Sequence, residues 1–532
     1  MNRPSKYVAI LPLLAISYIA SACGGGGTIT ASPAPGPAAG PYSASSLNGT
    51  YAFALSGSDS GGFFVRVGSF AANGTGMVTG GVQDLNSGRV PGSTTLTVSS
   101  GAYSIQSNGK GTLTLVDSSE TVQLSIVMTS ATAGLITETD GNATASGNFT
   151  LQDTTTFATF PTTISGPYVF DISGLDPNGA NESFVGQFVG NAGGGISTGV
   201  VDINDNFSAS GQLPITTASF TRDATNAATF GRGTAVFTIN GSTLNFAFYT
   251  VGAGRLRLMR TDFPAASLGD AVAQTGTIPT TASGLSGNFA FIVAGSSLSG
   301  SEVRGGRFTL NGGAVTNIQL DDDDSSASGS GNSNHTAIPK GTISAATYTV
   351  DSSGEGGGTI TFTDSSNGTF SFIFYLISPT QAVIQDVSVG QGTVPIITAD
   401  GSMQMQTGSP FTTAAEAGNW GLNWSGLSIN GTTGILAEED FVGQYTQTSS
   451  GSISGGVDFT ELSAQSVVLG AAFSGSMTVS GDGTGRNTYT ITLATSPSST
   501  LNFAAYLVDP NTTFVVGVDT HRTIVGSILR NY

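Results

Sequence analysis

The segment GTYAFAL at positions 49–55 sets the pattern on which most of this 532-residue chain is built. Its altered copies are GPYVFDI at 166–172, GNFAFIV at 287–293 and GNWGLNW at 418–424. Their first glycines recur at intervals of 117, 121 and 131 residues. Within each copy, aromatic and apolar residues occupy alternate positions, as in a strand with one buried face. We therefore expect four strands that point these side chains into four cores.

Further features follow each copy in the same order, which indicates a repeated unit and not an isolated motif. A strand with a Gly-x-aromatic pattern comes next, then a Gly-rich hairpin, then a strand that ends at an acid. The glycines of the second strand are Gly68, Gly186, Gly306 and Gly443, and the acids are Asp84, Asp202, Asp321 and Asp458. A second Gly-rich hairpin and the most apolar strand complete the pattern. Each unit should hold about eight short strands.

The sequence predicts an all-β protein of four tandem antiparallel units, at 46–153, 164–276, 285–408 and 416–532. Closing each meander into an up-and-down barrel would remove exposed strand edges. The opening Gly-x-aromatic strand resembles that of the calycins (lipocalins and avidin-like barrels), most closely at Gly418-Asn419-Trp420. That resemblance implies small barrels.

Two other all-β folds stay open. Immunoglobulin-like sandwiches tend to be shorter and use Greek-key crossovers. A transmembrane β-barrel needs strands of about 9–11 residues with a lipid-facing apolar band, and we expect shorter, glycine-broken strands here.

The N-terminus has the features of an export signal. Basic Arg3 and Lys6 precede an apolar stretch at 7–20, which is too short to cross a bilayer comfortably as a helix. The following Ser21-Ala22-Cys23 resembles the lipobox of bacterial lipoproteins, although Ala20 stands where Leu is usual. An ordinary signal peptide is the alternative.

The lipobox resemblance implies cleavage after residue 22 and acylation of Cys23, the single cysteine. Residues 23–45 are rich in Gly, Pro and Ala and would form a tether between lipid and folded units. Gly24 after the cysteine fits outer-membrane sorting. We expect an exported protein, anchored to a membrane by its lipid, with the outer membrane or cell surface as its location.

Charge excludes one class of partner. The chain carries a net charge of −18 with 16 basic residues, and no Lys/Arg cluster occurs. Nucleic-acid binding needs a basic surface, so we expect no nucleic-acid partner.

Catalytic groups are scarce in this sequence. The two histidines, His335 and His521, fall in different units, and we expect both to be solvated loop residues. The repeated aspartates could supply paired carboxylates, but an Asp at a strand end commonly caps a turn, which is the interpretation we favour. We predict no enzyme activity and no cofactor.

Two acidic segments resemble calcium loops. Asp202, Asn204 and Asn206 place oxygens at alternate positions, as an EF-hand does, but Phe207 replaces its turn glycine. The run at 321–324 reads as a solvated insertion. A weak calcium site is possible at the first segment, and a metal-free protein is the favoured interpretation.

The leading hypothesis is a non-enzymatic, lipid-anchored repeat protein for adhesion or cell-envelope interaction, with an envelope protein or polysaccharide as partner. The alternative is a barrel that binds a small apolar or glycan ligand, with Trp420 and Trp424 facing it. An enzyme that uses the repeated aspartates is the third hypothesis.

Overall fold

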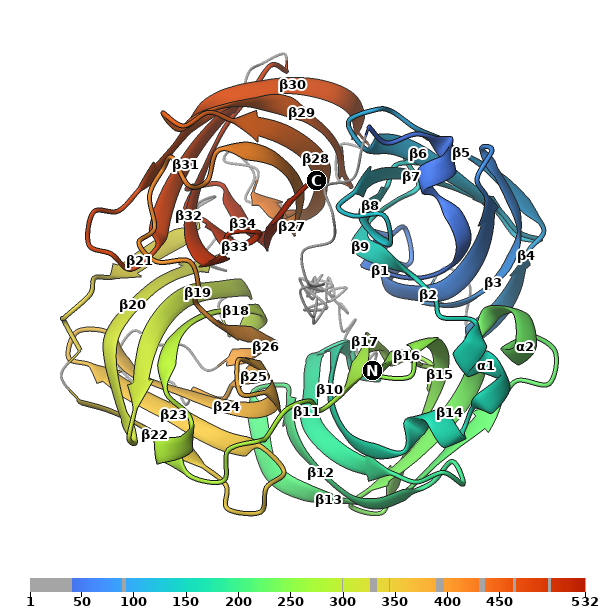
Figure 1. The fold of residues 1–532 in the computed structure, drawn as a ribbon, viewed down its shortest axis with the longest axis horizontal. Helices are drawn as coiled ribbons and strands as arrows, with labels where there is room; N and C mark the ends of the chain where they lie inside the picture. The colour runs from blue at the N-terminus through green and yellow to red at the C-terminus, as the bar shows by residue number, and fades with distance from the viewer. Residues whose placement is uncertain are drawn as a thin grey trace, which may run out of the picture.

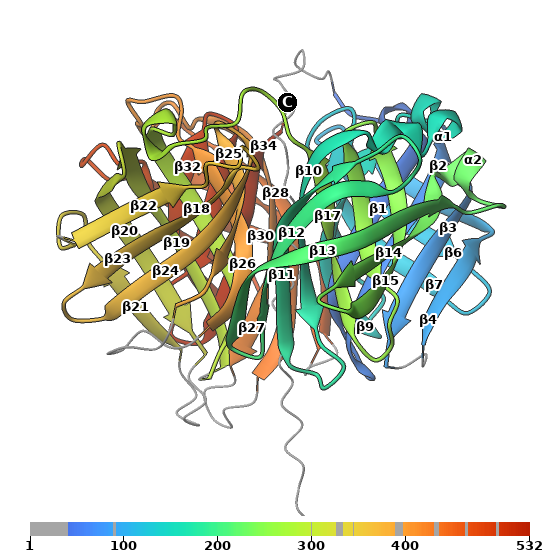
Figure 2. The same cartoon turned by 90° about the horizontal axis from the view of Figure 1, so that it is seen from below.

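The computed structural model describes residues 41–88, 92–298, 300–325, 333–343, 345–388, 397–429, 436–462, 466–495 and 499–531. The chain forms four closed antiparallel β-barrels, numbered 1 to 4 in chain order, that stand side by side in a ring (Figure 1). Seen from the side, the strands of all four barrels run between two common faces of the ring (Figure 2). The prediction of four up-and-down barrels is confirmed, and the immunoglobulin-like alternative is wrong.

Barrel 1 closes through pairing of β2 with β3, and β4 and β5 together form one broken strand beside β3. Its elements are η1 (Ala44–Ser46), β1 (Asn48–Asp59), β2 (Gly62–Asn73), β3 (Met77–Ser87), β4 (Ser93–Val98), β5 (Ser100–Ile105), β6 (Lys110–Val116), β7 (Thr121–Met128), β8 (Ala133–Glu138) and β9 (Ala143–Leu151).

Barrel 2 is a closed barrel of eight strands, in which the single long strand β13 replaces the broken one. Its elements are α1 (Thr155–Thr159), η2 (Thr162–Ile164), β10 (Gly166–Leu175), β11 (Asn181–Gly190), β12 (Ile196–Asp205), β13 (Ser208–Arg222), α2 (Ala227–Phe230), β14 (Arg232–Ile239), β15 (Ser242–Gly252), β16 (Arg255–Arg260) and β17 (Ala266–Ala273).

Barrel 3 repeats the arrangement of barrel 1, with β21 and β22 in place of one continuous strand. Its elements are η3 (Ala282–Gly284), β18 (Gly287–Ser297), β19 (Gly300–Asn311), β20 (Ala314–Asp324), β21 (Asn334–Ile338), β22 (Ala345–Val350), β23 (Gly357–Asp364), β24 (Gly368–Ser378), β25 (Gln381–Asp386) and β26 (Ile397–Met405).

Barrel 4 repeats the arrangement of barrel 2, with the long strand β30. Its elements are β27 (Gly418–Ile429), β28 (Leu436–Gln447), β29 (Ser452–Glu461), β30 (Ser466–Val479), β31 (Arg486–Leu493), β32 (Ser499–Asp509), β33 (Thr512–Gly517) and β34 (Arg522–Arg530). Many strands of the four barrels are longer than the sequence led us to expect; β1 and β27, for example, each have 12 residues.

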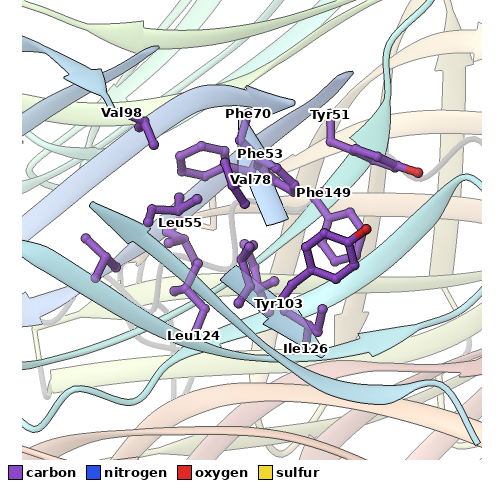
Figure 3. Close-up of a cluster of buried hydrophobic side chains, with 14 of the residues drawn as sticks. Tyr51, Phe53, Leu55, Phe70, Val78, Val98, Tyr103, Leu124, Ile126 and Phe149 are labelled. Carbon is purple, nitrogen blue, oxygen red and sulfur yellow. The ribbon is translucent and has the colours of Figure 1, made fainter. Parts of the chain in front are cut away.

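Each barrel is filled by its own side chains. Tyr51, Phe53 and Leu55 of the first copy point inward and pack with Phe70 and Phe149, as Figure 3 shows. The other three copies occupy the same place in their barrels. The expected inward face of the repeated motif is therefore confirmed.

The glycine of the second strand has a steric role. Gly68 lies directly opposite Phe53 in the β1–β2 register, and a Cβ there would stand 2.7 Å from the Phe53 ring. Gly186 and Gly306 stand in the same relation to Phe170 and Phe291. The two motifs recur together because the aromatic ring lies over the glycine of the neighbouring strand.

The outward positions on the rim of the ring are polar. They are mainly Thr and Ser, and the large hydrophobic residues exposed in the described part of the chain are Met77, Phe263, Leu298 and Leu469. In the same described residues, no helix is long and apolar enough to span a bilayer.

Candidate functional site

The two tryptophans that could have faced a ligand belong to the core of barrel 4. Trp420 and Trp424 are both almost fully buried. The Trp420 indole donates to the carbonyl of Glu416, and the Arg530 guanidinium lies 4.5 Å from its ring centroid. Trp424 packs 4.4 Å from the Phe503 ring centroid. Both side chains fill the barrel and do not line a cup.

The repeated aspartates lie at the junctions between barrels, which we name 1/2, 2/3, 3/4 and 4/1. Asp84 is buried within β3 and does not cap a turn. Arg232 of barrel 2 donates two hydrogen bonds to its carboxylate, at 2.8 and 2.7 Å, and Tyr249 donates a third at 2.7 Å. The turn-capping interpretation is wrong for Asp84, whose carboxylate binds side chains of the next barrel. Asp202 and Asp458 each also accept a hydrogen bond from a backbone amide of their own barrel, that of Gln212 and Gly470.

The other three junctions keep this arrangement in full or in part. Asp321 receives two hydrogen bonds from Arg486, at 2.7 and 2.8 Å, and one from Tyr506. From barrel 3, Asp202 receives a hydrogen bond from Tyr375 but none from an arginine, because Gly357 occupies the position of the arginine. Asp458 pairs with Lys110 at 2.6 Å, and Val127 occupies the position of the tyrosine.

The cation and the tyrosine come from directly opposed positions on two neighbouring strands. Arg232 faces Tyr249 in the β14–β15 register, and Arg486 faces Tyr506 in the β31–β32 register. We did not single out these residues from the sequence. The signal was present, because Lys110, Arg232 and Arg486 recur at one place in the second Gly-rich hairpin.

A second position, two residues after Asp84 and Asp202, also makes contacts across the junction. The Asn86 side-chain amide donates to the carbonyls of Arg260 and Ala265. Asn204 does the same to Asp386 and Ile397 of barrel 3. The suggested calcium ligands Asp202 and Asn204 thus have protein partners at the 2/3 junction. Asn206 lies beyond them in the β12–β13 turn with φ 46°.

A glutamine after the last strand of a barrel makes the third type of crossing contact. The Gln152 side chain donates to the carbonyls of Phe230 and Thr250, at 3.1 and 2.7 Å. Gln274 and Gln406 repeat these contacts in barrels 3 and 4. Asn531 closes the ring by donating to the Asn108 carbonyl of barrel 1 at 3.0 Å.

His335 is not a loop residue but part of β21, and its ring nitrogen lies 3.0 Å from the Asp321 carboxylate. Burial alone would raise the pKa of Asp321, but hydrogen bonds from His335 and Arg486 outweigh it and lower that pKa to about 2. The aspartate is therefore a fixed anion that holds the junction. His521 belongs to barrel 4, outside this group.

The acidic run at 321–324 was expected to be solvated. It lies in β20 instead, where Asp321 and Asp323 are fully buried. In the described residues, no group of three or more His, Cys, Asp or Glu side chains could hold a metal ion. Cys23, the signal segment and residues 23–40 of the tether lie outside the described residues.

The junctions differ in how much apolar surface they bury. In the described residues, the 1/2 junction holds a cluster of eleven buried apolar side chains and the 3/4 junction one of nine. The 2/3 junction holds six and the 4/1 junction three, Val127, Leu135 and Val442. The 1/2 and 3/4 junctions are also those with a complete Asp–Arg–Tyr contact.

Two hollows lie between barrels. One of about 110 Å³ lies at the centre of the ring and is lined by residues of all four barrels. The other is a groove of about 500 Å³ that opens at the 4/1 junction. Its lining is polar and uncharged, and includes Tyr42, Asn108, Asn419, Gln444, Ser454 and Asn531.

The outer face carries a repeated threonine. Two residues after the position of Lys110 in each barrel stands an exposed threonine, at Thr112, Thr234, Thr359 and Thr488. Further hydroxyls flank it, such as Thr349, which lies 2.8 Å from the hydroxyl of Thr359. Each barrel thus presents a similar hydroxyl-rich strip to solvent.

Known proteins give little guidance on what this ring does. No protein family and no curated protein matches the chain. A double mutant of the vaccine antigen transferrin binding protein B from Haemophilus parasuis is 9% identical, over 75% of this chain and 83% of that one, with a TM-score of 0.20.

Two further solved structures are no closer. Transferrin binding protein B from serogroup B Neisseria meningitidis is 11% identical, over 75% and 85% of the two chains, with a TM-score of 0.18. OccK2 from Pseudomonas aeruginosa in complex with glucuronate is 9% identical, over 91% and 97%, with a TM-score of 0.11. At these scores none of the three likenesses carries an inference about function.

Proposed function

We propose that this chain is a non-enzymatic ring scaffold, exported and anchored through a lipid on Cys23, that binds a polymer of the cell envelope through its outer face. The observation that carries the proposal is the exposed threonine found at one position in all four barrels. The repeated charged groups are engaged between barrels, whereas the outer strips are a fourfold surface open to a partner.

Four similar strips on one ring favour a repetitive partner. When one strip binds, the others stand close to further copies of the same ligand, which raises overall binding strength far above that of one strip. Hydroxyl-bearing strands suit the hydroxyls and amides of an envelope polysaccharide or of a repetitive surface protein.

The test compares two sets of four substitutions in the full chain. Thr112→Lys, Thr234→Lys, Thr359→Lys and Thr488→Lys alter the strips. The control changes the exposed residues Ser118, Thr225, Ser352 and Ser449 to Lys and adds the same charge elsewhere. Binding to isolated envelope fractions is measured with and without protease treatment.

We expect the strip variant to lose at least about tenfold in binding, because avidity multiplies four small losses. The control should stay within about twofold. Protease sensitivity of the binding material identifies a protein partner, and resistance identifies a polysaccharide. Equal binding by both variants, or hydrolysis of the envelope material by the unaltered chain, would overturn the proposal.

The groove at the 4/1 junction favours a second candidate function, binding of a small neutral glycan. Its neutral amide and hydroxyl lining matches sugar hydroxyls, whereas the interiors of the barrels are packed with their own side chains. Trp420 follows the groove residue Asn419, so its fluorescence should change on titration with neutral saccharides, and Asn419→Ala should weaken the response. An unchanged signal across a panel of saccharides counts against this function.

A further inference from the structure

The 4/1 junction is the seam of the ring, because no polypeptide linker joins barrel 4 to barrel 1. Strand β28 packs there against β7, β8 and β9. The seam has the smallest apolar cluster of the four junctions and a lysine contact in place of the Arg–Tyr pair. Its closure therefore depends strongly on the polar groups that it buries.

Two carboxyl groups lie at the centre of this seam. Glu438 and Asp440 occupy alternate positions of β28 and point away from the core of barrel 4. Ser58 of β1 donates a hydrogen bond to Glu438, and Thr144 of β9 donates one to Asp440 at 2.6 Å. Both acids are almost completely buried, and one Asp440 oxygen has no hydrogen-bond partner among the described residues.

Among the described residues, no cation pairs with Glu438 or Asp440. The cations at the seam are already engaged: Arg522 with Glu439 at 2.9 Å and Lys110 with Asp458 at 2.6 Å. The remaining titratable groups on the packed strands are acids, namely Asp59 on β1, Glu138 on β8 and Glu461 on β29. Ionisation of Glu438 and Asp440 would thus place uncompensated charge in a closed interface.

The 1/2 and 3/4 junctions show that the repeat does not need these acids. The position of Asp440 is held by Val65 in barrel 1 and by Val303 in barrel 3. Both valines belong to the apolar clusters of their junctions. The seam therefore buries an acid, Asp440, at a position where these two junctions bury a valine.

We propose that the 4/1 seam is a pH-dependent closure of the ring, shut while Glu438 and Asp440 are protonated and loosened when they ionise.

The titration properties of the two acids support this role. Burial raises the pKa of Asp440 to about 7, and burial together with the neighbouring Asp440 charge raises the pKa of Glu438 above its usual range. In the open ring both groups would return toward ordinary carboxyl pKa values near 4. The closed form therefore holds more protons between pH 4 and 7, and closure weakens as the pH rises through that window.

The experiment reads seam opening with a buried thiol. Val442→Cys places the thiol in the seam cluster, and the matched control Val67→Cys places it at the equivalent position of the 1/2 junction. Maleimide labelling rates of the two full chains are compared from pH 5 to 8, after subtraction of any labelling at Cys23. Taking their ratio cancels the intrinsic pH dependence of thiol reactivity.

We expect the ratio of the Val442→Cys rate to the Val67→Cys rate to rise at least about tenfold over this range. Adding Glu438→Gln and Asp440→Asn to the Val442→Cys chain should keep the ratio flat and low. Should this triple variant fail to fold, Asp440→Asn alone should shift the midpoint of the rise. A flat ratio in the unaltered seam, or a rise unaffected by removing the acids, would overturn the proposal.

Discussion

The 1/2 and 4/1 junctions are built from the same strands of the same repeat, yet they use different chemistry. At 1/2, an apolar cluster surrounds a buried Asp84–Arg232–Tyr249 contact. At 4/1, a lysine remains from that contact, and two buried acids, hydrogen-bonded to Ser58 and Thr144, replace apolar side chains. The difference shows that equal topology does not give equal junctions.

The same contrast separates 3/4 from 2/3, so the ring repeats with a period of two barrels. The 2/3 junction also buries two acids, Asp171 of β10 and Asp400 of β26, although these stand at other positions of the repeat. Burial and the nearby Asp400 charge raise the pKa of Asp171, and burial raises that of Asp400 to about 7. Barrels 1 and 3 share a broken strand, whereas barrels 2 and 4 share a continuous one. The ring therefore consists of two strongly joined pairs.

Removing a cation from a strong junction should have the largest effect on stability. Arg232→Met would leave Asp84 buried without its ion-pair partner, and we expect a loss of about 3–5 kcal/mol in the free energy of unfolding. Urea denaturation followed by circular dichroism measures it. Lys110→Met at the seam is the matched comparison and should cost less, since Lys110 makes a single hydrogen bond to Asp458. Equal losses would contradict the ranking of the junctions.

Introducing an acid into a strong junction should turn it into a weak one. Val65→Asp places a carboxyl at the position of Asp440 but within the apolar 1/2 cluster. We expect a loss of about 3 kcal/mol at pH 8 and a smaller loss at pH 5, where the group stays protonated. Denaturation at both pH values tests this, with Val65→Asn as the uncharged control. A loss independent of pH would show that the interface admits water.

Lowering the pH should weaken the 3/4 junction, whereas it should strengthen the closure of the seam. Because the pKa of Asp321 is lowered to about 2, its contribution is present above pH 4 and declines as the pH falls toward 2. This corresponds to about 2 kcal/mol. The unaltered chain should lose this amount between pH 5 and pH 2 relative to Asp321→Asn. Parallel curves for the two chains would rule out Asp321 as the source.

The smallest effects should come from removing a tyrosine hydroxyl, with a larger loss at a weak junction than at a strong one. Tyr375→Phe removes the hydrogen bond that Asp202 accepts from barrel 3, while the Gln212 backbone amide still donates one to Asp202 at 2.9 Å. We expect a loss of about 1–2 kcal/mol. Tyr249→Phe is the matched change at 1/2, where Arg232 still holds the acid, and it should cost about 1 kcal/mol or less. A larger loss for Tyr249→Phe would reverse the comparison.

The barrels could be predicted from the sequence because period-two alternation marks the inward face of each strand. The alternate spacing of apolar residues is enough to predict that Phe53 and Phe170 are buried. The junctions could not be predicted in this way. Ala52 and Ala54 are as small as many solvent-facing residues of a strand, yet they are buried in the 1/2 cluster. The partner of Asp84 lies 148 residues away, at Arg232. Comparing the four copies for recurring cations would have exposed that link.

Tyr42 and Asn531 both line the groove at the seam, so the two ends of the described chain meet at one junction. Any of the four barrels could thus serve as the first in a circularly permuted chain, with the old ends joined by a short linker. Such a permutant would keep every barrel and move only the gap in the covalent chain. Opening the chain after barrel 1 would place that gap at the apolar 1/2 junction, where the ring would stay closed at any moderate pH.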